Sequence, residues 1–496
     1  MKRKMLSRLM AASLAAIMVV GMAGCGDDTT DPSDSTPSND NSNDNSGNSG
    51  DNNGDNPGNN NNEEVGQYTV IKDPATGEAY DLGGVEIIIR DWFSGDPQEP
   101  SNSYEEAVQD WRDWIQETYN FTIKQQAISD WGSTPQDFAD YVSTGGDDNW
   151  YAFTLRDDVT TTSAMGKGFM WDLTKLDCLD LSEEKFTKNK TLDLYTHNGA
   201  VYAMYAGDPE PRTGIYFNKR ILTERNINYQ DIYEMEKNGT WTWSAWTDLM
   251  DKVQAVDDNG DNVPDVWGFN VNNGMLLKCA IFSNGGEIIG KDASGKYVYK
   301  AEDPETVEAL NWAAGVFNDY MQLEPEGAQW DYYQQAFMNG EVAFLVEDAY
   351  MITGLLAGMT DDWGFVVFPK PDGKDIDYTN LYANNLVCIP SCYNEDKAWK
   401  IAFAWNLYTN DIPGYEDYEG WKPGYKKTAR DDETVDLTLA MMVKNGMVSY
   451  HGVIPDLNPD PDFFWRAGKN MDVSNILEGI RESWKTLIDD ANARNY

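Results

Sequence analysis

The pattern of apolar and polar positions from residue 84 onward predicts strands and helices in alternation. A β-branched apolar run at 84–93 predicts a strand that ends in a loop, and apolar residues at helical spacing predict a helix over 103–120. The run at 121–128 predicts a second strand, and a predicted helix over 135–145 begins at a proline and ends at a glycine. This order predicts an α/β fold with a parallel-type sheet and helices on both of its faces.

Residues 1–24 have the layout of a secretory signal peptide. A basic start precedes an apolar run at 9–20 that is too short to span a bilayer. The segment 21–25 (GMAGC) resembles a bacterial lipobox, in which the cysteine receives a diacylglycerol and becomes the new amino terminus. The resemblance implies that Cys25 is a lipidation site that anchors the chain on the extracytoplasmic face of the cell membrane. The alternative is an ordinary signal peptide with an incidental cysteine.

Residues 25–65 are almost free of apolar side chains. Such a segment cannot bury enough surface to offset the entropy of ordering, so we expect a disordered polar linker. The chain beyond it has no run of about 18 apolar residues, and we expect it to be soluble. It is long enough for two domains at the usual size of about 100 to 200 residues each.

The charge balance narrows the classes of ligand. The 38 basic and 83 acidic residues give a formal net charge of −45. A surface this negative repels nucleic acid and anionic lipid, and it favours neutral or cationic ligands. The composition, 41% hydrophobic with 12% aromatic residues, is that of a folded globular chain.

Cysteine and histidine contribute little candidate chemistry. Only His197 and His451 are present, which excludes a multi-histidine zinc site and argues against a histidine-dependent triad. The spacing of the remaining cysteines matches no disulfide framework, so one or two disulfides are conceivable and their pairing stays open. These cysteines are Cys178, Cys279, Cys388 and Cys392.

Several short motifs occur in an order and spacing that resemble one protein family. They include GVEIIIRDWFSGD, YAFTLRDDVTTTSAMGKGFMWDLTKL, GAVYAMYAGDPEPRTGIYFNKRILTERNI, GTWTWSAWTDLMDKV and YYQQAFMNGEVAFLVEDAY. Together they resemble the extracellular solute-binding proteins of the maltose-binding-protein-like group, the substrate-binding lipoproteins of ABC importers. The resemblance covers the chain from about residue 84 onward.

The resemblance implies a type II periplasmic-binding-protein-like fold with two α/β lobes and three hinge crossings. We expect lobe one at 66–203 and 380–410, and lobe two at 204–379 and 411–496. Such a receptor closes on a solute by a hinge motion and delivers it to the permease subunits of the transporter. It is a monomer, performs no catalysis and requires no cofactor.

Because a sugar has apolar C–H faces and a rim of hydroxyls, its site combines aromatic rings with carboxylates, amides and arginines. Loops at predicted strand ends and near the predicted crossings supply such side chains, and relatives place a stacking aromatic near the position of Trp465. We therefore predict a neutral oligosaccharide as the solute. The candidate ligand-binding residues are Asp91, Trp92, Arg156, Asp157, Tyr205, Asp208, Glu210, Arg212, Glu347, Asp348, Asn384 and Trp465.

One loop carries oxygen ligands at calcium-binding spacing. Positions within 257–268 resemble the first part of an EF-hand loop, with a structural calcium as the implied ion. The loop departs from that pattern at its sixth position, which is Asn262, and at its twelfth, which is Gly268. The alternative is an Asx-rich turn without metal. The candidate ligands are Asp257, Asn259, Asp261, the carbonyl of Val263, and Asp265.

Three other functions are consistent with parts of this pattern. The same receptor fold would serve a peptide, an amino-acid derivative or a polyamine. A surface adhesin or structural lipoprotein would keep the fold without transport. A glycoside hydrolase needs two carboxyl groups at a defined separation, which neighbours such as Glu347 and Asp348 do not establish. No G-x-S-x-G, H-E-x-x-H or phosphate-binding glycine loop occurs.

Overall fold

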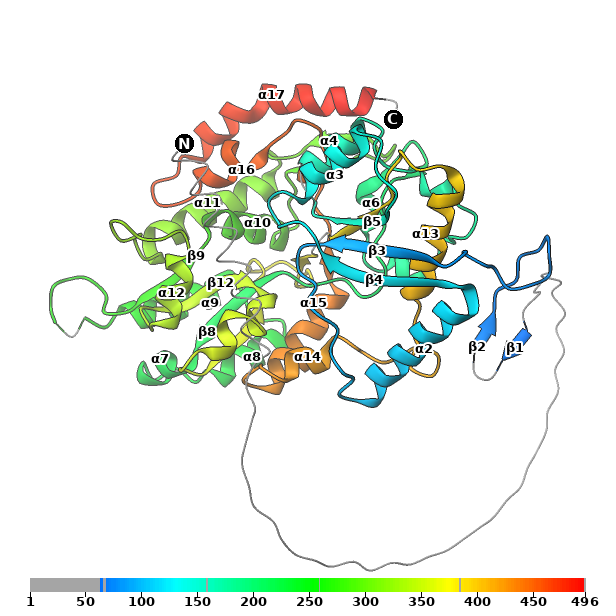
Figure 1. Cartoon of the computed structure of the whole chain (residues 1–496). Coiled ribbons are helices and arrows are strands. Elements are labelled where there is room, and N and C mark those ends of the chain that lie inside the picture. Colours follow the sequence, from blue (N-terminus) through cyan, green and yellow to red (C-terminus); the bar gives the residue numbers. More distant parts are fainter. Residues whose placement is uncertain (1–62, 66–67, 158, 258, 383–384, 495–496) are drawn as a thin grey trace, which may run out of the picture.

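The computed structural model describes residues 63–65, 68–157, 159–257, 259–382 and 385–494. Two α/β lobes, each built around a four-stranded sheet, lie side by side (Figure 1). The predicted α/β class is therefore correct. Cys25, and the predicted linker up to residue 62, lie outside the described residues.

The first lobe is built on a sheet with the strand order β15-β5-β3-β4. Strand β3 is parallel to both β4 and β5, while β15 is antiparallel to β5. The register pairs Asp91 with Ala127, so the loops after β3 and β4 leave the same edge of the sheet. The strands are β3 (Val85–Asp91), β4 (Phe121–Ala127), β5 (Trp150–Leu155) and β15 (Leu386–Cys388).

Long helices pack against this sheet. Asn102 caps α2 by accepting a hydrogen bond from the N–H of Glu105, and Asn120 ends the helix in the left-handed conformation. Ile87 and Ile89 of β3 point to the side where Trp111 of α2 and Trp405 of α13 form one core. The helices are α2 (Ser103–Tyr119), α3 (Thr134–Ser143), α4 (Val159–Gly166) and α13 (Glu395–Tyr408).

Short elements complete this lobe. The hairpin of β1 and β2 places Tyr68 against Trp111 and Trp114. The segment after α4 folds into short helices and a two-stranded ribbon. These elements are β1 (Glu63–Val65), β2 (Tyr68–Val70), η2 (Leu173–Lys175), α5 (Glu184–Thr187), α6 (Thr191–Tyr195), β6 (Thr196–His197) and β7 (Ala200–Val201).

The second lobe is built on a sheet with the order β13-β8-β12-β9. Strand β12 is parallel to β9 and antiparallel to β8. Its residues 342–347 are all buried, as expected for an apolar strand in the interior of a sheet. The strands are β8 (Thr213–Asn218), β9 (Trp267–Val271), β12 (Val342–Asp348) and β13 (Trp363–Val367).

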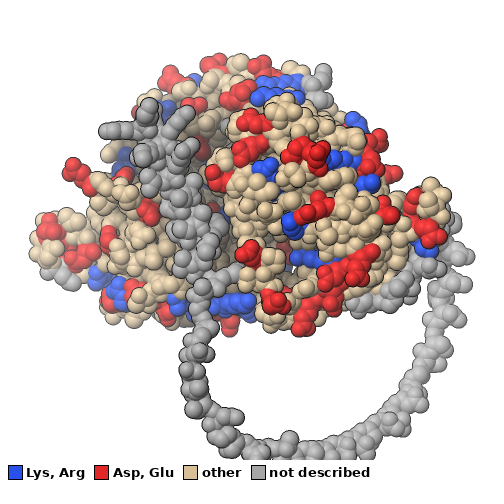
Figure 2. All heavy atoms as spheres, viewed as in Figure 1, with Lys and Arg blue, Asp and Glu red and all other residues tan. Residues whose placement is uncertain are grey.

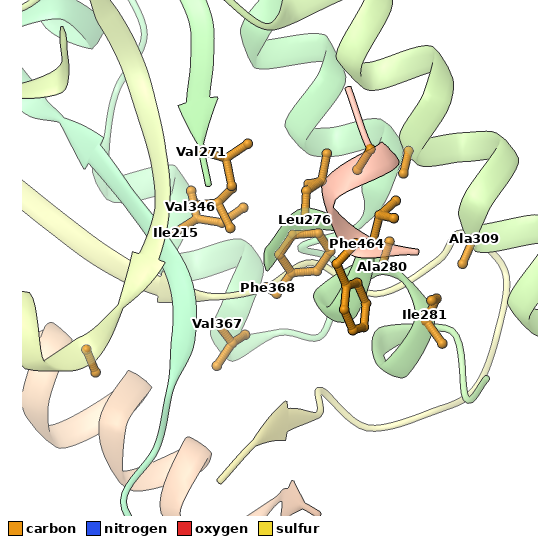
Figure 3. Close-up of a cluster of buried hydrophobic side chains, with 14 of the residues drawn as sticks. Ile215, Val271, Leu276, Ala280, Ile281, Ala309, Val346, Val367, Phe368 and Phe464 are labelled. Carbon is orange, nitrogen blue, oxygen red and sulfur yellow. The ribbon is translucent and has the colours of Figure 1, made fainter. Parts of the chain in front are cut away.

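Helices enclose the second sheet in an extensive apolar core. Figure 3 shows part of it, where Ile215 and Val346 lie near Leu276 and Phe464. The helices around it are α7 (Lys219–Glu224), α8 (Gln230–Lys237), α9 (Trp243–Gln254), α10 (Asn273–Ser283), α11 (Pro304–Tyr320), α12 (Tyr332–Met338), α14 (Lys422–Lys426), α15 (Ala440–Lys444), α16 (Pro459–Asp462) and α17 (Val473–Ala493).

Short elements make up the rest of the described chain. They are β10 (Ile289–Lys291), β11 (Tyr297–Tyr299), η3 (Ala349–Ile352), η4 (Leu355–Gly358), β14 (Asn380–Leu381), η5 (Thr434–Leu439), β16 (Gly446–Met447), η6 (Tyr450–Gly452) and η7 (Phe464–Arg466). The four described cysteines outside the signal are all free thiols. Among the described residues, no helix is both long and apolar enough to cross a membrane.

Two connecting segments run antiparallel where they pass between the lobes. Met204 bridges Val387, and Pro211 bridges Tyr382. Close to the second bridge, the N–H of Arg212 donates to the carbonyl of Leu381 over 3.1 Å. The predicted division at 66–203 with 380–410 puts all four strands of the first sheet in lobe one, and it remains a prediction.

A carboxyl group is buried in the second lobe. Glu236 of α8 accepts hydrogen bonds from the N–H of Val367 (2.8 Å) and the hydroxyl of Thr438 (2.7 Å). Burial raises the pKa of Glu236 from 4.5 to about 7. Between about pH 4.5 and 7, Glu236 is protonated in the folded state and ionised in the unfolded state. The free energy of unfolding therefore declines as the pH rises through this range.

We expect Glu236→Gln to reduce this pH dependence, because the neutral amide has no charge to desolvate. The raised pKa of Glu236 corresponds to a difference of about 3 kcal/mol in the free energy of unfolding between a pH below 4.5 and a pH above 7. Denaturant titrations at pH 5 and pH 8 measure the difference, and Glu234→Gln on the exposed side of the same helix is the matched control. An equal pH dependence in both variants would contradict the assignment.

Candidate functional site

The loop after β3 is shaped by a buried carboxylate. Asp91 is fully buried, and its Oδ1 accepts bonds from the N–H groups of Phe93 and Ser94 and from the hydroxyl of Ser94, at 2.7 to 3.2 Å. This turn presents the half-buried Trp92 and the 43% exposed Phe93 at the strand end. Asp91 therefore builds the loop, and its second oxygen has no partner among the described residues.

The loops after β4 and β5 meet at the same edge. The guanidinium carbon of Arg156, which follows β5, lies 3.8 Å from the ring centroid of Trp131, which follows β4. Trp131 is 57% exposed. Asp157 accepts a hydrogen bond of 3.0 Å from the hydroxyl of Tyr195. The first lobe thus gathers Trp92, Trp131, Arg156 and Asp157 at the carboxyl edge of its parallel strands.

In the second lobe, β12 ends in two adjacent carboxylates with different surroundings. Glu347 is buried, and its oxygens accept from Gln334 and from the N–H of Asp348, both over 2.9 Å. Burial and then the neighbouring Asp348 raise the pKa of Glu347 to about 7. Asp348 accepts from the hydroxyl of Thr213 over 2.7 Å. Both carboxylates are therefore tied into the end of the sheet.

Arg212 lies between two carboxylates without a close bond to either. Its Nη1 is 3.4 Å from Glu210 and 3.8 Å from Asp348. No side-chain hydrogen bond of Arg212 occurs within the described part of the chain. The guanidinium is partly exposed, so its N–H groups remain available to an incoming acceptor.

Tyrosines surround this charged group. Tyr350 is 37% exposed, and its ring centroid lies 5.7 Å from the Arg212 guanidinium. Burial, followed by the charge of Glu210, raises the pKa of Tyr205 to about 12, and the same two causes raise that of Tyr425. These phenols stay protonated at neutral pH. Their hydroxyls make no hydrogen bond to any other described residue, so each is available as donor and acceptor.

The remaining predicted residues fall in three different places. Trp465 is 73% exposed in η7, next to Phe464, which packs on Gly274 near the start of α10. Since α10 follows β9, this places Trp465 toward the carboxyl end of that strand. Asp208 forms an ion pair of 2.8 Å with Lys188. Asn384 lies outside the described residues.

Sequence reasoning pointed to Tyr350, which follows the apolar strand before Glu347, but it missed Trp131 and Tyr425. Trp131 stands a few residues beyond the predicted strand at 121–128, and that position is a usable signal. Tyr425 lies on α14 in a segment without clear periodicity, and only the fold brings it near Arg212.

The predicted calcium loop lies before β9, at the opposite end of this strand from the candidate site. The carboxylate of Asp257 accepts from the N–H groups of Gly260 (2.7 Å) and Asn262 (2.8 Å). Asn262 has φ 65°, so it adopts the left-handed conformation that glycine gives an EF-hand loop at its sixth position. No group of three or more potential metal-ligating side chains converges in the described part of the chain. Calcium binding stays a prediction.

A cavity of about 570 Å³ lies elsewhere, between the β1–β2 hairpin, α2 and the segment after α13. Its lining includes Tyr68, Trp111 and Lys185, and none of the predicted ligand-binding residues. Figure 2 shows acidic side chains spread over the visible face of the molecule, with fewer basic ones among them. Acidic residues are thus widespread on this surface, and what sets the site at the strand ends apart from it is its aromatic rings and its arginines.

No protein-family model and no curated protein matches this sequence. Solved structures do match. UgpB from Mycobacterium tuberculosis in complex with glycerophosphocholine is 16% identical with a TM-score of 0.55, and the match covers 82% of this chain and 99% of that chain. The cyclic α-maltosyl-1,6-maltose binding protein from Arthrobacter globiformis is 14% identical with a TM-score of 0.53, covering 83% of this chain and 97% of that one.

A sugar transporter from Rhizobium etli in an open conformation is 14% identical with a TM-score of 0.53, covering 83% of this chain and all of that one (100%). Likeness at this level of identity shows the fold. The expected resemblance to maltose-binding-like proteins is confirmed at the level of the fold: this chain shares the two-lobe fold of these structures.

Proposed function

We propose that this protein is the extracytoplasmic solute receptor of an ABC importer and that it captures an oligosaccharide between its two lobes. One observation carries the proposal: at the carboxyl ends of strands in both sheets, half-buried or exposed aromatic rings lie beside charged and phenolic groups. Trp92 and Trp131 lie on the first lobe, and Tyr350 and Trp465 on the second. We call these two groups of residues the two walls of the site. A ligand that contacts both walls would stabilise a closed form of the protein.

The chemistry of the second wall supports a hydroxylated ligand. Tyr205, Tyr350 and Tyr425 offer phenolic donors and acceptors, and Arg212 offers unfilled donors beside the acceptor Glu210. A sugar presents hydroxyls around its rim and C–H groups on its faces. The wall therefore suits a sugar better than it suits a ligand with a long apolar body.

The comparisons support the carbohydrate class over the alternatives. Among the similar structures, one is a cyclic maltosyl-maltose binding protein and one is a sugar transporter. Binding of a peptide, an amino-acid derivative or a polyamine, and a role as adhesin, have no comparable support. A glycoside hydrolase is disfavoured because Glu347 is buried with both oxygens bonded to neighbouring groups. We propose a receptor without catalysis.

We further propose that Cys25 carries the lipid that holds the receptor at the extracytoplasmic face of the membrane. The polar segment between Cys25 and β1, which begins at Glu63, would then act as a flexible tether. A flexible chain of this length has a root-mean-square span of about 35 Å. The receptor would thus stay near the membrane and reach the permease subunits while keeping its orientation free.

The first test is thermal unfolding of the protein against mono- and oligosaccharides, peptides and polyamines, each with calcium or a chelator. A ligand at 100 times its dissociation constant adds about 2.7 kcal/mol to the unfolding free energy. We expect an oligosaccharide to raise the melting temperature. For that ligand, Trp465→Ala should weaken binding by about 1 to 3 kcal/mol in calorimetry, because a stacking face is lost.

Leu323→Ala is the matched control, because Leu323 is a large exposed apolar residue of the segment after α11 and is not among the candidate ligand-binding or calcium-binding residues. Stabilisation by a peptide or polyamine alone would keep the receptor fold and replace the solute. If Trp465→Ala binds as tightly as Leu323→Ala, Trp465 is no part of the site. A melting temperature that depends on calcium would support the structural ion.

The second test concerns the anchor. Cys25→Ser removes the acceptor of the lipid, so we expect the variant to leave the membrane fraction while the unsubstituted protein stays in it. Mass spectrometry of the amino-terminal peptide should find a diacylglycerol on Cys25. An unmodified mature cysteine, or membrane retention of the serine variant, would contradict the proposal.

A further inference from the structure

The loop that follows β4 exposes a large indole at the edge where the first lobe presents its other candidate residues. Trp131 is 57% exposed, although tryptophan is usually well buried. The neighbouring loop after β3 carries Trp92 and Phe93, and Arg156 follows β5 on the other side. The sequence pattern alone assigns no role to Trp131.

Hydrogen bonds hold this loop in place. The N–H of Ile128 donates to the carbonyl of Asp91 over 3.1 Å, and Arg90 donates to the hydroxyl of Ser129 over 3.0 Å. The Oδ1 of Asp130 accepts from the N–H groups of Gly132 and Ser133, both over 2.9 Å. The backbone on both sides of Trp131 is thus fixed before any ligand arrives, which lowers the entropic cost of binding.

The indole is also supported from beneath. The guanidinium carbon of Arg156 lies 3.8 Å from the ring centroid, which is the distance of direct stacking. An arginine that supports one face of the ring leaves the opposite face as the exposed surface. Arg156 was expected to donate to a ligand hydroxyl, but this contact gives it a different task.

We propose that the Trp131 indole is a stacking platform for one pyranose ring of the solute, and that Arg156 is a positioning residue that holds the indole from its other face. The proposal rests on the proposed function, because the ligand is the carbohydrate that the receptor captures. The proposal adds Trp131 as a ligand contact on the first lobe. It also means that Arg156 is not one of the residues that donate hydrogen bonds to sugar hydroxyls.

The size of the exposed surface favours a sugar ring over a protein partner. The exposed apolar side chains at this edge are Trp131, Ile128 and, on the adjacent loop, Phe93. The polar residues Ser129, Asp130 and Ser133 flank the indole, so the apolar surface here stays small. A stable protein interface needs about 1,200 Å² or more of buried surface in total. One indole face matches one pyranose face.

The arginine also decides between neutral and cationic ligands at this platform. A cation binds an aromatic face through the negative charge of its π cloud. The Arg156 guanidinium already occupies one face of Trp131, and it would repel a second cation on the other. The platform therefore suits a neutral sugar, and it disfavours the ammonium groups of a polyamine.

Calorimetry with the carbohydrate that stabilises the unsubstituted protein tests the platform. We expect Trp131→Ala to raise the dissociation constant tenfold or more, and Trp131→Phe to raise it less because a ring remains. Trp399→Phe, on α13 where the indole packs on Phe403, is the control and should leave it unchanged. Unaltered melting temperatures confirm that each variant is folded.

Acrylamide quenching of fluorescence tests the role of Arg156. The chain has 18 tryptophans, so the signal of Trp131 is taken as the difference between each protein and its Trp131→Phe counterpart. We expect Arg156→Met to increase the quenching of Trp131 and to weaken binding only while Trp131 is present. The contrary result is that Arg156→Met leaves the quenching unchanged and weakens binding by the same factor whether residue 131 is Trp or Phe. Arg156 would then contact the ligand directly, and its positioning role would be overturned.

The outcomes separate this proposal from the proposed function. If the unsubstituted protein binds a carbohydrate and Trp131→Ala binds it equally well, the platform is wrong and the receptor stands. If the unsubstituted protein binds no carbohydrate in the panel, both proposals fail.

Discussion

The pairing of two connecting segments between the lobes is the constraint on which the rest of the structure depends. Met204 bridges Val387 and Pro211 bridges Tyr382, so the chain enters the second lobe at a fixed register. Arg212, bonded through its N–H to Leu381, then leads directly into β8. Because β8 pairs antiparallel with β12, the start of β8 lies beside the end of β12, and Arg212 comes within 3.8 Å of Asp348.

From this register follow two walls with different chemistry. The second lobe concentrates phenols and carboxylates around one arginine, in a region where burial keeps the phenols protonated. The first lobe offers indoles on loops that are held by backbone bonds and by arginine stacking. Under the proposed function, the indoles of the first lobe and the hydroxyl partners of the second would share the recognition of a sugar, and a ligand held by both lobes would couple binding to closure.

The sequence predicted the local elements better than the site. Apolar periodicity located β3, α2, β4 and α3, since these elements each bury one face or one stripe. Periodicity could not show that Asp91 is a buried carboxylate that bonds within its own turn, and not an exposed carboxylate of a loop. Trp131 and Arg156 stack although they lie on two different loops, which only the order of the strands brings together. No local sequence pattern could therefore predict this contact.

The central claim is that both lobes close on a carbohydrate, and small-angle X-ray scattering tests it most directly. With a carbohydrate that stabilises the protein at saturating concentration, the account predicts a smaller radius of gyration than without it, as the lobes rotate together. A bound carbohydrate that leaves the radius of gyration unchanged would contradict the account, because the solute would then be held without closure.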